Sequence, residues 1–183
     1  KVMDLNWQNL PLLESLFFIR RKDRFEKTLY SLEKIIKSDG FPSDNKIEAL
    51  SFLYINLHKI NLYFTDGNFD KGLTVIPKID SQLKLFKNRI DEHHVMTFYY
   101  KFASMYFGSG DNDTCIFYLD KIISNKSLSM RQDLLCFSRI LNLFAHYEAG
   151  YDYHIETLLK STYKFLLKMN DLHEVQKEMI KFI

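Results

Sequence analysis

The sequence predicts an all-α protein built from about four stacked antiparallel helical hairpins and a C-terminal helix. Three observations lead to this fold class. Apolar residues recur at steps of three and four along most of the chain, as on one face of a helix. Glycine and Asp/Asn residues, which end and cap helices, interrupt this pattern. Related segments return roughly every 40 residues, a period typical of helical-repeat proteins.

The elements are expected in pairs over residues 9–38, 44–88, 92–125 and 129–170, within a single domain that is part of a longer protein. The individual helices are predicted near residues 9–22, 25–38, 44–65, 69–88, 92–108, 112–125, 129–149, 153–169 and 172–183.

Turn residues justify the boundaries between these helices. The run Asp39-Gly-Phe-Pro-Ser ends the first pair, and Ser43 or Asp44 is expected to cap the next helix. Gly67 and Gly110 are expected to take positive φ at the corners of the second and third pairs. Pro77 should kink the fourth helix or mark its first turn.

The repeated segments match one another at these corners. The segment 63–79 matches 106–122 with Gly67 on Gly110, and 147–163 matches with Gly150 on Gly110 and a turn one residue shorter. The segment 20–35 supplies a first copy without glycine, aligned by placing Phe25 on Phe69.

This pattern resembles the tetratricopeptide repeat (TPR) family over roughly residues 9–170, as a divergent relative with longer helices. In the third copy, the residues that carry the resemblance are Ala103, Tyr106, Gly110 and Cys115. In the second copy, they are Tyr63, Gly67, Phe69 and Gly72. The resemblance implies a right-handed α-α superhelix, a solenoid whose concave surface binds partners.

The resemblance also implies which residues line that surface, because first-helix side chains point inward in the family. These candidate partner-binding residues are Tyr54, Leu57, Asn61 and Phe64 in the second copy and Thr97, Tyr100, Ser104 and Phe107 in the third, with Ser138 and Ala145 as weaker choices in the fourth. Asn and Tyr side chains could form hydrogen bonds with the backbone of an extended peptide. The alternative is that this aromatic stripe belongs to the core.

No catalytic residue, metal site or cofactor is predicted. Residues 91–94 (Asp-Glu-His-His) place carboxylates beside imidazoles, but adjacent helical residues diverge and cannot converge on one ion, so a helix-capping segment is expected. The histidines are scattered, and no nucleophile motif or phosphate-binding glycine loop occurs. Cys115 and Cys136 lack metal-ligand or redox spacing and are expected to be buried thiols.

Charge and hydropathy limit which partners and which cellular location are expected. The net charge of +2 does not favour nucleic acid or a membrane as a partner, and the basic residues between 20 and 27 are expected to form a solvated helix junction. No apolar run approaches the roughly 20 residues that span a bilayer, and no signal-peptide pattern opens the sequence. A cytoplasmic location is therefore expected.

The predicted function is a non-enzymatic interaction module, a scaffold that binds a peptide or protein segment on its concave face. The alternative is a sensory or regulatory domain of a larger signalling or transcription-regulating protein. The predicted end helix, 172–183, carries an apolar stripe that would cap the last hairpin or pair with a second copy of the chain in a homodimer.

Overall fold

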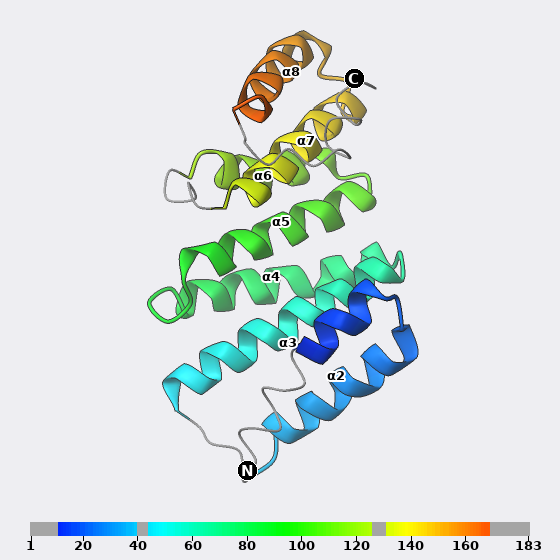
Figure 1. Ribbon diagram of the computed structural model, residues 1–183, viewed down its shortest axis with the longest axis vertical. Coiled ribbons are helices and arrows are strands. Elements are labelled where there is room, and N and C mark those ends of the chain that lie inside the picture. The colour runs from blue at the N-terminus through cyan, green and yellow to red at the C-terminus, as the bar shows by residue number, and fades with distance from the viewer. Residues whose placement is uncertain (1–10, 40–43, 126–130, 169–183) are drawn as a thin grey trace. The chain divides into compact units, whose positions relative to one another are not determined.

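The computed structural model describes residues 11–39, 44–125 and 131–168, and all its regular structure in these ranges is helical (Figure 1). A helix over residues 11–18 precedes seven others. Their bounds are α2 (Lys22–Ile36), α3 (Asn45–Thr65), α4 (Phe69–Leu85), α5 (Glu92–Gly108), α6 (Asn112–Ile123), α7 (Gln132–Glu148) and α8 (Asp152–Leu166). The predicted all-α class is confirmed. The predicted end helix at 172–183 lies outside the described residues.

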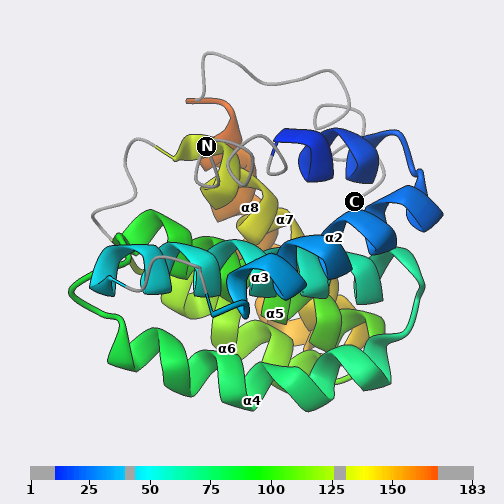
Figure 2. The same ribbon diagram turned by 90° about the horizontal axis from the view of Figure 1, so that it is seen from below.

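Contacts divide the chain into two compact units, unit 1 (Lys1–Val95) and unit 2 (Met96–Ile183). In unit 1, α3 packs against both α2 and α4 (Figure 2). Leu13 and Leu16 of the first helix share a core cluster with Phe25, Leu29 and Leu32 of α2. Each such side chain, when fully buried, stabilises the fold by about 1.5–3 kcal/mol.

In unit 2, α7 packs against both α6 and α8. Aromatic contacts join α5 to α6: the ring of Tyr106 stacks on Tyr118 at 5.8 Å between centroids, and Phe102 meets the same ring edge-on at 5.4 Å. Helices joined by turns of three residues or fewer and packed on each other run antiparallel, so the pairs α5–α6 and α7–α8 are helical hairpins.

Three hairpin corners share one backbone geometry built on glycine. Gly67, Gly110 and Gly150 have φ values of 62°, 84° and 74°. In each corner, the glycine N–H donates a hydrogen bond to the carbonyl three residues earlier. The N–H of the residue after the glycine donates to the carbonyl five residues before that residue. This Schellman pattern satisfies carbonyl groups that the ending helix leaves without partners. The expectation of positive φ at Gly67 and Gly110 is confirmed.

The first corner repeats these hydrogen bonds without glycine. The N–H of Arg20 bonds to Phe17 O at 3.1 Å, and that of Arg21 bonds to Leu16 O at 3.0 Å. Arg20 takes φ +55°, the one positive φ among the described non-glycine residues. Here the sequence-based boundaries were wrong: the first helix does not run to residue 22, and α2 begins at Lys22 instead of residue 25.

The corners also correct the alignment of the repeats. Arg20 has the same position in its corner as Gly67 has in the next one. Counted five residues on from the corner, Phe25 is therefore equivalent to Gly72 and not to Phe69. The corner at Gly150 has the same hydrogen bonds as that at Gly110, so it is not one residue shorter.

The remaining boundaries follow from capping. Asp44 caps α3 by accepting from the backbone N–H groups of Lys46 and Ile47, both at 2.8 Å, as predicted for one of two candidates. Pro77 lies inside α4 instead of at its start, because Asn68 already caps that helix. The proline ring leaves α4 without one internal N–H donor.

Replacing Arg20 by Gly should raise the free energy of unfolding by about 0.5–1 kcal/mol. A non-glycine residue at positive φ costs about 1–2 kcal/mol, and the greater freedom of glycine in the unfolded chain cancels part of the gain. Urea denaturation measures the change. Arg21→Gly is the matched control, because it removes the same charge at a residue with φ −87°. Equal stability of the two variants would contradict the geometry at residue 20.

Candidate functional site

The candidate residues of unit 1 lie on α3 and differ in exposure. Tyr54 and Leu57 are half-buried. Asn61 is only 7% exposed, whereas Phe64 is 46% exposed and its ring meets that of Phe69 at 5.9 Å. Of these four side chains, Phe64 offers the most surface to a ligand. Their role in binding stays a prediction.

The candidate residues of unit 2, Thr97, Tyr100, Ser104 and Phe107, lie on α5 and are all half-buried. The Ser104 hydroxyl donates to the carbonyl of Tyr100 at 2.9 Å, so its proton is already used within the helix. The ring of Tyr100 contacts that of Phe137 on α7, with centroids 6.5 Å apart. Burial raises the pKa of Tyr100, so its hydroxyl stays protonated as a donor near neutral pH.

The fourth copy presents different residues from those chosen on sequence. Ser138 and Ala145 are 0% exposed, so neither lies on a surface that a ligand reaches. With Gly150 equivalent to Gly110, the α7 residues equivalent to the four candidate residues of α5 are Phe137, Ile140, Phe144 and Tyr147. Phe137 is 44% exposed and Tyr147 is 65% exposed. The register chosen from the sequence was off by one residue because the turn at Gly150 was taken to be one residue shorter than that at Gly110, whereas the two turns have the same hydrogen bonds.

Asp91 precedes α5 and residues 92–94 form its first turn, as expected for a capping segment. Asp91 accepts from the backbone N–H of His94 at 3.0 Å, and its other oxygen lies 2.6 Å from His94 Nδ1. Burial acts to raise the pKa of Asp91, but the hydrogen bonds from His94 outweigh it and lower the pKa. Within the described ranges, no group of three His, Cys, Asp or Glu side chains is arranged to hold a metal ion.

Unit 2 also contains an aromatic cluster that the sequence did not single out. Lys121 of α6 lies over the rings of Phe117 at 4.1 Å and Tyr99 at 4.9 Å. A cation held over aromatic faces stabilises the fold by about 0.5–2 kcal/mol, depending on its hydration. Tyr118 at its centre is only 7% exposed and packs α5 against α6, while Phe117 at the edge of the cluster is 54% exposed.

Both cysteines are buried, as predicted, and should resist modification. Cys115 and Cys136 are 0% exposed, and burial raises their thiol pKa values to about 12 and about 11. Since the thiolate is the reactive form, Ellman's reagent should label the native protein only as fast as it unfolds. The denatured protein should react at once at both thiols. Rapid labelling of one thiol per native chain by the reagent would contradict this burial.

Comparison with protein-family models, curated proteins and solved structures finds no match to this chain. None of the described helices is both long enough and apolar enough to cross a membrane.

Proposed function

We propose that the chain is a TPR-like, non-enzymatic interaction module that binds an extended peptide or protein segment. The binding surface would be the face formed by the first helices of successive pairs, and the stacked pairs would form the superhelix that the sequence resemblance implies. Four corners with the same backbone hydrogen bonds and the same three-residue spacing between helices support the proposal, because copies of one repeated unit would share their turns.

The contact between Tyr100 and Phe137 is the observation that carries the proposal. It joins α5 to α7, the first helices of two successive pairs, through side chains of the candidate face. On α5, Phe107 lies two turns beyond Tyr100, and on α7, Tyr147 lies about three turns beyond Phe137. An elongated surface with aromatic side chains is suited to an extended segment whose apolar side chains pack on the rings.

Selection of peptides from a random displayed library, with the full chain as bait, tests the proposal. Each selected peptide is then measured against the double variant Phe137→Ser/Tyr147→Ser. Loss of two aromatic anchors should weaken binding by about tenfold or more. The matched control is Tyr153→Ser/Tyr163→Ser, which removes two exposed tyrosines from α8, a second helix of a pair.

Each outcome bears on the proposal. Peptides that lose affinity for the α7 variant and keep it for the α8 variant would support the binding face. Peptides that bind both variants equally would place binding elsewhere. Failure to select any peptide would contradict peptide binding by this chain.

A further inference from the structure

The first corner of unit 1 exposes two adjacent apolar side chains. Phe18 is 79% exposed and Ile19 is 63% exposed, at the end of the helix over residues 11–18. Single exposed apolar residues are ordinary on protein surfaces, but here two adjacent ones protrude together and are followed directly by basic residues. Their high exposure leaves both side chains free to enter the apolar layer of a partner.

Basic residues follow directly along the chain. The segment 20–27 contains five basic and two acidic residues, a net charge of +3 in a chain whose total is +2. Lys22 is paired with Asp66 at 3.0 Å. Arg20, Arg21 and Arg24 are exposed, and in the part of the chain that the structure describes they form no ion pair. Positive charge is therefore concentrated at this corner and available to an anionic partner.

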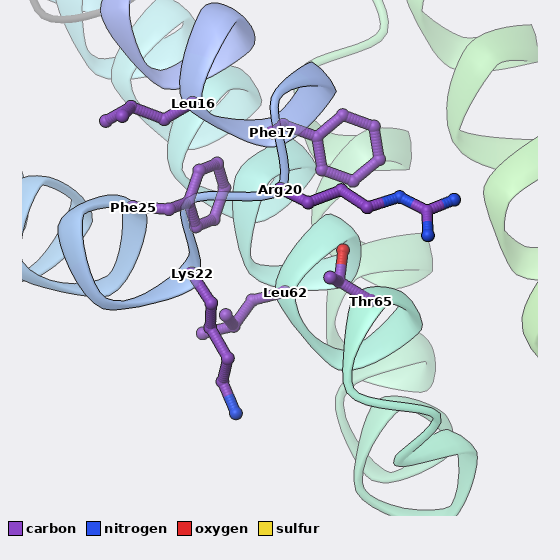
Figure 3. Close-up of a pocket in the computed structure, with 7 residues that line it drawn as sticks. All are labelled: Leu16, Phe17, Arg20, Lys22, Phe25, Leu62 and Thr65. Atoms are coloured by element: carbon purple, nitrogen blue, oxygen red, sulfur yellow. The ribbon is translucent and has the colours of Figure 1, made fainter.

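The corner also supports the Arg20 side chain. A hollow beneath it is lined by Leu16, Phe17, Phe25 and Leu62, with Lys22 and Thr65 at its sides (Figure 3). Arg20 and Phe17 both line this hollow, and in the view of Figure 3 the Arg20 side chain extends away from Phe25. An arginine stem can lie on apolar surface while its guanidinium stays in water. Arg20 stands at positive φ, where the three other corners have glycine.

We propose that residues 18–24 are a docking surface for anionic phospholipid membranes. Phe18 and Ile19 enter the interface between headgroups and acyl chains, and Arg20, Arg21 and Arg24 bind the lipid phosphates around them. Protruding apolar side chains bordered by cations match a bilayer, which has a negative surface above an apolar layer. From the sequence, no membrane partner was expected, and the basic residues between 20 and 27 were interpreted as a solvated helix junction; the exposure of Phe18 and Ile19 beside them leads to the different proposal. This surface contains none of the residues named for the proposed peptide-binding face.

Sedimentation with vesicles tests the proposal. The full chain should bind vesicles of phosphatidylcholine with phosphatidylserine, bind those of phosphatidylcholine alone far more weakly, and dissociate at high salt. Phe18→Ser/Ile19→Ser should lower the partition coefficient about tenfold or more, and each Arg→Gln change at residues 20, 21 or 24 about fivefold. Tyr153→Ser is the control, because Tyr153 is also 79% exposed, beside Asp152. Circular dichroism checks that every variant is folded.

Fluorescence locates the inserted residue. With the single tryptophan removed by Trp7→Phe, a Phe18→Trp probe should shift its emission to the blue on addition of the anionic vesicles. A Tyr153→Trp probe in the same background should not shift. Absence of binding, binding unaffected by the residue 18 and 19 changes, or an unshifted Phe18→Trp signal would overturn the proposal. So would vesicle-independent binding of an acidic protein to this corner.

Discussion

Replacing Gly110 by Val should lower the free energy of unfolding by about 1–2 kcal/mol or more. Gly110 has φ +84°, and no atom lies within 4 Å of where its Cβ would stand. The cost therefore comes from backbone strain alone, since a β-branched residue tolerates positive φ poorly. Thermal and urea denaturation measure the loss.

Two further substitutions separate strain from other effects at this corner. Gly110→Asn should cost less than Gly110→Val, because Asn tolerates the left-handed region. Gly108→Ala, at the end of α5 where φ is not positive, should be neutral or slightly stabilising. If Gly110→Val melted at the wild-type temperature, the corner would have to be built differently from the one described.

The stability of the protein should rise between pH 8 and pH 10.5 relative to a Lys101→Met variant. Lys101 is half-buried on α5, and desolvation lowers its pKa from 10.5 to about 8. Between these values the unfolded chain binds a proton that the native chain does not, so the free energy of unfolding increases with pH. Below pH 8 both states are protonated, and the native state bears the full cost of the buried charge.

The difference between the two proteins isolates Lys101 from other titrating groups. Cys115 and Cys136 have raised pKa values and therefore reduce stability as the pH rises above about 9, but they do so in both proteins. Urea denaturation across this pH range should show the free energy of unfolding of the wild type increasing by about 1–3 kcal/mol relative to that of the variant. A constant difference would show that Lys101 keeps an ordinary pKa in the native state.

Helices and corners were predictable where local chemistry specified them. Asp44, Gly67 and Gly110 mark boundaries through side-chain capping or positive φ, and the structure uses each in that way. The first corner was missed because Arg20 adopts a conformation that its residue type does not signal. Tertiary packing around Leu16 and Phe25, rather than local preference, holds that corner in place.

The candidate site was predictable only in outline. Helical spacing identifies which residues share a face, but burial depends on the neighbouring helices. Asn61 is thus 7% exposed, while Phe64, one turn later, is 46% exposed. The choice of Ser138 and Ala145 was wrong because neighbouring residues on a helix point about 100° apart. A shift of one residue therefore selects core positions instead of surface positions.

Chemical-shift mapping of a selected peptide on the isotopically labelled full chain tests the binding face most directly. The proposed function predicts that, in unit 2, the largest shifts occur at Tyr100 and Phe107 of α5 and at Phe137 and Tyr147 of α7. Amides of α6 and α8 should change little. Shifts concentrated on α6 and α8, with α5 and α7 unaffected, would contradict binding on the first-helix face.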